Sequence, residues 1–134
     1  MRVMIIVKAS HASETGATPS VAMVTAIDKF NEELLKAGVL LAAECLRPSA
    51  RGKRVRFCDS KRLVIDGPFE PTRELVSGYW LWQVTSIDEA VEWLKRCPNP
   101  SVGESEIEIR PVMEMTSGER TGFQTFSSRS EFAG

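Results

Sequence analysis

Three of the strands that this sequence predicts carry apolar residues at consecutive positions, yet only two amphipathic helices are available to cover them. The first run, residues 3–7, is continuous and rich in β-branched side chains, and the others span residues 39–46 and 78–84. Strands of this kind are typically buried on both faces of a sheet. Two helices cover one face only, so the second face must be covered by something else. The simplest cover is the same face of another copy, in a two-fold homodimer.

The two helices are indicated by capping residues and by apolar spacing. The first is expected at about residues 19–37, with Thr18 as its N-cap and Pro19 in its first turn. One apolar stripe runs along it: Met23, Ile27, Phe30 and Leu34. The second helix follows Ser86, whose spacing from Glu89 is that of a capping box.

A hairpin is expected in the middle of the chain. Val55 and Phe57 alternate with Arg54 and Arg56, the pattern of a half-buried strand, and residues 63–65 pair back onto it. The last strand is expected within residues 106–115. The resulting order is β-α-β, hairpin, β-α-β, which predicts an α+β fold of ferredoxin-like type with a hairpin inserted in its middle.

The charge balance and the cysteines restrict the class of protein further. The 134 residues include 17 Lys and Arg and 18 Asp and Glu, so nothing overall indicates a nucleic-acid or membrane partner. No apolar run approaches the ~20 residues of a membrane span. The three cysteines are odd in number and widely spaced, which suits reduced thiols in a cytoplasm. We expect one cytoplasmic domain over residues 1–115 and a loose polar tail over 116–134.

A long motif carries a family resemblance. Residues 66–80 read DGPFEPTRELVSGYW, and this stretch resembles the YCII-related proteins of the DGPF subgroup. Shorter stretches at residues 37–40, 44–48, 86–90 and 108–112 are similar to the same group, so the likeness covers about residues 2–115. The resemblance implies a dimeric α+β barrel in an uncharacterised bacterial cytoplasmic protein. The resemblance has two further implications. Some members of this group are encoded beside sigma-factor-like regulators, and some relatives have a His–Asp pair in a cleft.

Asp66 is the first candidate site residue, and two roles are open for it. It ends a strand beside Phe69, Tyr79 and Trp80, where a carboxyl group of raised pKa could act as general acid or base or could line a ligand cleft. Alternatively, it caps the turn by accepting backbone N–H bonds. In that role Gly67 supplies a free φ angle and Pro68 a fixed one, so the cleft would be built from Asp66, Gly67, Pro68, Phe69 and Tyr79.

His11 is the only histidine and the second candidate for catalysis. It follows the first strand, where it could pair with Asp66, and its side chain titrates near neutral pH. The alternative is that residues 10–18 form a polar, exposed loop in which His11 has no catalytic role.

Basic residues gather around the hairpin. Seven lie within sixteen positions: Arg47, Arg51, Lys53, Arg54, Arg56, Lys61 and Arg62. Arg54 and Arg56 in particular could grip a carboxylate or phosphate of a ligand. The alternative is a solvated hairpin that balances the acidic residues near Glu106. No nucleic-acid motif accompanies these charges, so nucleic acid is not the expected partner.

The aromatic strand and the absence of cofactor motifs complete the predictions. Trp80 and Trp82 share one face of their strand and Tyr79 and Leu81 the other, so one pair should meet the helices and the other a partner or ligand. Without a C-x-x-C pair, and with one histidine, no metal site is expected, and no phosphate loop or nucleotide motif indicates a cofactor.

Three functions remain open at this point. The first is a small-molecule binding protein without demonstrated catalysis. The second is an enzyme that uses Asp66, alone or together with His11, for proton transfer on a small organic substrate. The third, a regulatory module that binds a sigma factor, rests on the family context alone.

Overall fold

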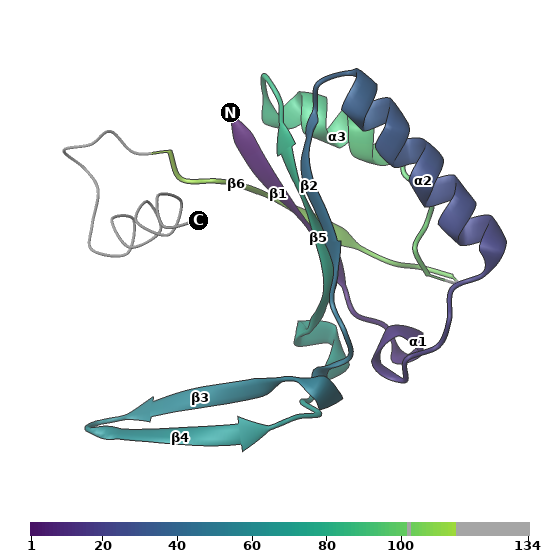
Figure 1. Ribbon diagram of the computed structural model, residues 1–134. Coiled ribbons are helices and arrows are strands. Elements are labelled where there is room, and N and C mark those ends of the chain that lie inside the picture. Colours follow the sequence, from purple (N-terminus) through teal and green to yellow (C-terminus); the bar gives the residue numbers. More distant parts are fainter. Residues whose placement is uncertain (102, 115–134) are drawn as a thin grey trace.

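The computed structural model describes residues 1–101 and 103–114 of the chain. Its main sheet has four antiparallel strands in the order β2 (Leu40–Cys45), β5 (Val76–Gln83), β1 (Arg2–Lys8) and β6 (Ile107–Pro111). Two helices, α2 (Val21–Lys36) and α3 (Ile87–Lys95), lie on one face of this sheet (Figure 1). The expected α+β class and the ferredoxin-like strand order are confirmed.

Aromatic packing joins this sheet to α2. Trp80 and Trp82 of β5 point toward the helices, and the ring of Phe30 meets both at centroid distances of 6.0 and 6.1 Å. Trp82 and Ile5 are fully buried beneath the helices. The alternation predicted for β5 is therefore confirmed, with Trp80 and Trp82 in the core.

The helix ends depart in detail from the predicted ones. Helix α2 begins at Val21, because the hydroxyl of Ser20 accepts the Met23 N–H bond at 3.1 Å, so the prediction of Thr18 as its cap is wrong. A short helix, α1 (His11–Glu14), was not expected, since it has no apolar stripe.

The predicted capping box of α3 is present only in part. Ser86 accepts the N–H of Glu89 at 3.1 Å, as expected. The Glu89 carboxylate instead accepts bonds from the backbone and hydroxyl of Thr85, and the backbone bond above all lowers the pKa of that carboxyl. The cap thus includes one residue more than the box motif predicts.

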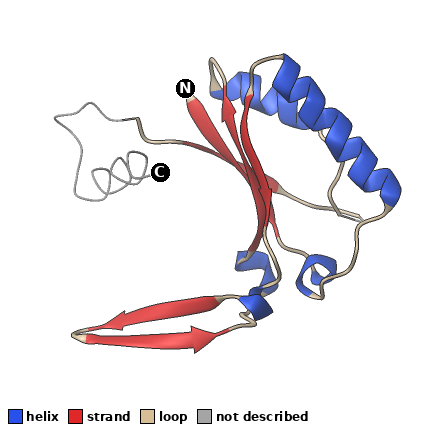
Figure 2. Ribbon diagram, in the orientation of Figure 1, coloured by secondary structure: helices blue, strands red, loops and turns tan. Residues whose placement is uncertain are grey.

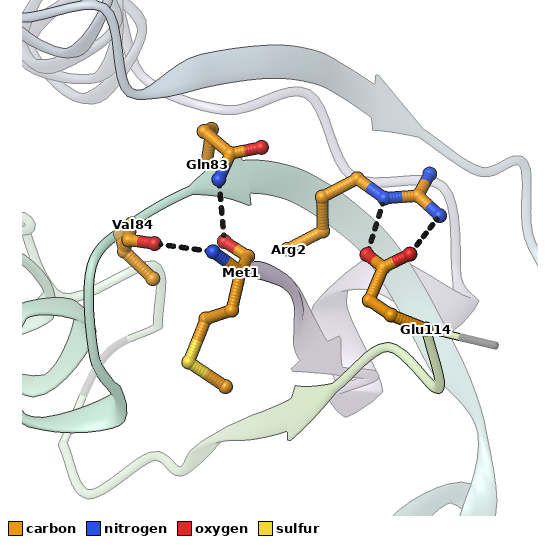
Figure 3. Close-up of polar contacts among 5 residues, drawn as sticks. All are labelled: Met1, Arg2, Gln83, Val84 and Glu114. Carbon is orange, nitrogen blue, oxygen red and sulfur yellow. Dashed lines mark hydrogen bonds and ion pairs between the residues drawn. The ribbon is translucent and has the colours of Figure 1, made fainter. Parts of the chain in front are cut away.

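Polar contacts hold the start of the chain against the ends of the neighbouring strands (Figure 3). The Met1 ammonium group donates to the carbonyl of Val84 at 2.8 Å, and the amide of Gln83 donates to the Met1 carbonyl at 3.1 Å. Arg2 Nε donates to Glu114 at 2.7 Å, and this bond lowers the pKa of the Glu114 carboxyl. The central strand β1 is thereby joined to both of its neighbours at this end of the sheet.

The hairpin forms a two-stranded sheet of its own, made of β3 (Lys53–Cys58) and β4 (Lys61–Asp66) (Figure 2). It makes no extensive contact with another helix or strand of the described chain. Val55 and Phe57 are 50% and 70% exposed, so the prediction of a half-buried strand is wrong. The alternating pattern correctly predicts a strand, but no part of the described chain covers it.

The last expected strand ends earlier than predicted, since β6 stops at Pro111. The tail expected over residues 116–134 lies outside the described residues. No helix of the described part is long and apolar enough to cross a membrane.

The aromatic core gives a first test of the fold. Trp82→Ala should lower the free energy of unfolding by about 3–5 kcal/mol, because it removes a fully buried indole and leaves a cavity. Val21→Ala, at a side chain 83% exposed on α2, should change it by less than about 0.5 kcal/mol. Urea unfolding followed by circular dichroism measures both. Equal losses in the two variants would contradict the assignment of Trp82 to the core.

Candidate functional site

A groove of about 360 Å³ opens between α1 and the short 3₁₀ helix η1 (Ser49–Arg51), next to the start of β5. We call it the α1–η1 groove. It is lined by Glu14, Leu46, Arg47, Pro48, Ser49, Arg51, Gly52, Leu75 and Val76. Its walls are therefore mostly aliphatic, with one carboxylate, one hydroxyl and two guanidinium groups among them. Such a lining suits a small ligand with an apolar part and a charged part.

Ser49 holds three separate segments together at this groove. Its backbone N–H donates to the Glu14 carboxylate at 2.9 Å, and its hydroxyl donates to the other carboxylate oxygen. The same hydroxyl accepts the N–H of Phe69 at 3.0 Å. Helix α1, η1 and the chain after the hairpin are thus fixed to one another by a single side chain.

Gly67 packs directly against the backbone of Ser49, next to this contact. Its N–H donates to the carbonyl of Gly52 at 3.0 Å. A Cβ atom on Gly67 would lie 1.8 Å from the carbonyl oxygen of Ser49, a distance that no side chain tolerates. Glycine is therefore required here because two backbone segments touch, and the prediction that Gly67 supplies a free φ angle is wrong, since its φ is not positive.

The match to known sequences spans this whole arrangement. Residues 1–116 match a family model described as the YCII-related domain. The chain belongs to this family. An uncharacterised protein of Rhizobium meliloti (strain 1021) is 29% identical over 93 residues, which cover 69% of this chain and 75% of that protein. The predicted YCII-related resemblance is confirmed, whereas assignment to the DGPF subgroup stays a prediction.

Asp66 of this YCII-related domain lies outside the groove. Its side chain is 74% exposed and pairs with Lys53 Nζ at 2.5 Å at the base of the hairpin. No backbone N–H of the described residues donates to its carboxylate, so the predicted turn cap is not formed. The backbone of Asp66 adjoins the groove, because Asp66 pairs with Lys53, the residue after Gly52, and its neighbour Gly67 donates to the Gly52 carbonyl. Trp80 cannot flank Asp66 as expected, because Trp80 is 6% exposed within the core.

The structure does not join the other residues predicted for an Asp66 cleft. The Phe69 ring lies at the base of the hairpin, with the Arg54 guanidinium 4.1 Å from its centroid. Tyr79 lies in the main sheet, opposite Ile6. Among the described residues, no hydrogen bond or ring contact connects Tyr79 to Phe69, and Pro68 follows a cis peptide bond in the turn between hairpin and sheet.

His11 begins helix α1 and is exposed. No hydrogen bond or ion pair within the described chain joins it to Asp66, so the His–Asp pair stays a prediction without geometric support. What holds α1 in place is Glu14, three positions later, together with Ser49. Sequence reasoning missed both of these residues, because a lone glutamate in a polar loop and a serine after Pro48 carry no periodic signal.

The basic residues divide into two groups. Arg47 and Arg51 line the α1–η1 groove and have no ion-pair partner in the part of the chain that the structure describes. Arg54 and Arg56 belong to β3 of the hairpin, and Arg56 is exposed. The ligand role predicted for Arg54 and Arg56 thus lies on the hairpin, whereas the groove itself holds the other two arginines.

The thiols and acidic side chains of the described residues form no metal-binding cluster, and the Cys97 thiol is partly buried. Within residues 1–101 and 103–114, no three His, Cys, Asp or Glu side chains gather as metal ligands. Burial raises the pKa of the Cys97 thiol to about 11, so this group is protonated at neutral pH and is a poor nucleophile.

The close approach at Gly67 gives a test of how the groove is built. Gly67→Ala should lower the free energy of unfolding by about 2 kcal/mol or more, because the added methyl group meets the Ser49 carbonyl. Gly52→Ala is the matched control, since its Cβ would lie 3.4 Å from the nearest atom and should cost under about 1 kcal/mol. Urea unfolding of both variants is the measurement. Equal stability would show that the two backbone segments do not touch.

Proposed function

We propose that this YCII-related protein binds a small organic anion in the α1–η1 groove. The observation that carries this proposal is the pair Arg47 and Arg51, two guanidinium groups without ion-pair partners among the described residues, beside an aliphatic wall. A guanidinium group binds a carboxylate or phosphate through two parallel hydrogen bonds. The wall formed by Leu46, Leu75 and Val76 would take up an apolar part of the ligand.

The charge of the groove lining favours an anion over a cation as ligand. The Glu14 carboxylate accepts two hydrogen bonds from Ser49 and so helps to hold the groove together. With two guanidinium groups and this one carboxylate, the lining has a net charge of +1. The cleft that the sequence predicts around Asp66, Phe69 and Tyr79 stays a prediction, and the charged groups of the proposed groove come from residues before the hairpin.

We also propose that the protein is a homodimer, in which two main sheets meet through the faces that the helices leave uncovered. The register places Met4 opposite Leu81 and Ile6 opposite Tyr79 on that face, which we call the open face. All four side chains are half-buried and lie outside the helix-covered core. An apolar sheet face of this kind is stabilised when a second layer covers it. Such a pair of sheets is the dimeric α/β barrel that the sequence predicts.

The other predicted functions have less support. Acid–base catalysis by Asp66 alone would need this side chain at a ligand site, but it is 74% exposed and does not line the groove. Catalysis by Asp66 with His11 would need the two side chains together, and no contact between them is formed among the described residues. Binding of a sigma factor rests on family context and has no surface of its own in the structure. A cytoplasmic location, and a domain boundary at residue 115, stay predictions of the sequence.

The anion proposal is tested with succinate and inorganic phosphate as probes. At least one of them should raise the melting temperature of the wild-type protein in a concentration-dependent way. Arg47→Gln combined with Arg51→Gln should abolish this rise, whereas Arg56→Gln on the hairpin should preserve it. Native mass spectrometry of freshly purified protein should in addition show a bound small mass. An identical thermal response in all three proteins would overturn the proposal.

The homodimer is tested at the open face. Sedimentation of the wild-type protein should give a mass of about 30 kDa, twice the 14.9 kDa of the chain. Ile6→Glu should give monomers, because burying an unpaired carboxylate between the sheets is unfavourable. Val24→Glu, on an exposed position of α2, is the control and should stay dimeric. A monomeric wild-type protein would refute this part of the proposal.

A further inference from the structure

The hairpin β3–β4 exposes more apolar surface than an isolated element of its size sustains. Four of its aliphatic and aromatic side chains are between 46% and 70% exposed: Val55, Phe57, Leu63 and Val64. A two-stranded hairpin without further packing is marginally stable in water. Something outside this subunit is therefore expected to cover part of it.

The two faces of the hairpin differ in chemistry. On the first face the register pairs Val55 with Val64, and Phe57 lies next to them opposite Arg62. The Arg62 guanidinium stacks on the Phe57 ring at 4.7 Å, and this leaves a strip of three adjacent apolar side chains. We call this strip, Val55, Phe57 and Val64, the arm strip.

The second face is more basic and is partly used within the subunit. The register pairs Arg54 with Ile65 and Arg56 with Leu63. Arg54 packs on the Phe69 ring at 4.1 Å, so the base of this face rests on its own domain. The arm strip, on the opposite face, points away from that contact and is free to meet another molecule.

The direction of the hairpin identifies the other molecule. The hairpin leaves the lower end of the main sheet and extends on the side away from α2 and α3, the side of the open face (Figure 1). A second copy stacked on the open face would occupy this same side. Strands of six residues reach about 20 Å, whereas stacked sheets lie about 10 Å apart, so the arm is long enough to reach a partner's sheet.

The charge distribution also favours a second copy of the chain as the partner of the hairpin. The hairpin, residues 53–66, holds five Lys and Arg and two Asp, a net charge of +3, while the whole chain has −1. The rest of the chain therefore carries −4. Glu44, at an outer strand of the open face, is exposed and has no ion-pair partner within the described residues. A positive arm meeting a negative body favours association between copies.

We propose that the β3–β4 hairpin is an arm that clasps the second copy of the chain through the arm strip. The inference rests on the proposed homodimer and adds a second contact to it, distinct from the open face. Each subunit covers the other's exposed hairpin, so the dimer stabilises an element that the monomer leaves without cover.

Two neighbouring residues on opposite faces give the test. Val64→Glu places a carboxylate in the arm strip and should raise the dimer dissociation constant at least about tenfold in sedimentation equilibrium. Leu63→Glu is the matched control, with the same substitution on the same strand but on the basic face, and should change the constant less than about threefold. Both positions are solvent-exposed in the subunit, so the domain should fold in each variant.

The outcomes separate this inference from the homodimer itself. A wild-type dimer that Ile6→Glu dissociates and Val64→Glu leaves unchanged would overturn the arm and keep the open-face contact. A monomeric wild-type protein would refute both. Hydrogen exchange gives an independent reading, because amides of residues 53–66 should exchange more slowly in the dimer than after dilution to monomer. Equal exchange in the two states would also contradict the arm.

Discussion

Packing of Trp80 and Trp82 against Phe30 determines which face of the main sheet is covered. Because side chains alternate along β5, burying these two indoles beneath α2 sends Tyr79 and Leu81 to the opposite side. Both helices lie on the tryptophan face, so the described residues place no layer on the other face. The open face, and with it the reason to expect a second copy, follows from this one alternation.

The groove depends on a different kind of contact, namely the meeting of backbone segments. Glu14 and Ser49 are 35 positions apart, and Gly67 lies against Ser49 without room for a Cβ atom. Three loops converge there because each is anchored to an end of a sheet strand. In the turn Asp66-Gly67-Pro68, the glycine thus contributes to the groove, while the aspartate pairs with Lys53 in solvent.

Membership of the YCII-related family indicates the fold, whereas the function has to be inferred from the residues of this chain. The chain is nearly neutral overall, but positive charge gathers at the two arginines of the groove and on the basic arm. They serve different purposes in our account. Arg47 and Arg51 face a small cavity, whereas the charges of the hairpin surround an apolar strip.

The order of helices and strands and the two faces of β5 could be predicted from the sequence, because periodicity and capping act over a few residues within single elements. The prediction of a YCII-related domain came instead from the resemblance of residues 66–80 and shorter stretches to that family. Sequence reasoning misplaced the cap of α2 by two positions, because Thr18, Pro19 and Ser20 form a run in which more than one residue is a suitable cap. Which of these residues caps the helix depends on the backbone geometry of its first turn.

Other features could be seen only in the folded chain: the hairpin leaves the sheet, and the Asp66 side chain faces solvent. The same is true of the contact between Glu14 and Ser49 and of the position of Arg47 and Arg51 at the groove. Each of these depends on contacts between segments far apart in the chain, or on their absence. Alternation along β3 predicts a strand equally well whether or not another layer covers it, so the exposure of Phe57 could not be read from the pattern.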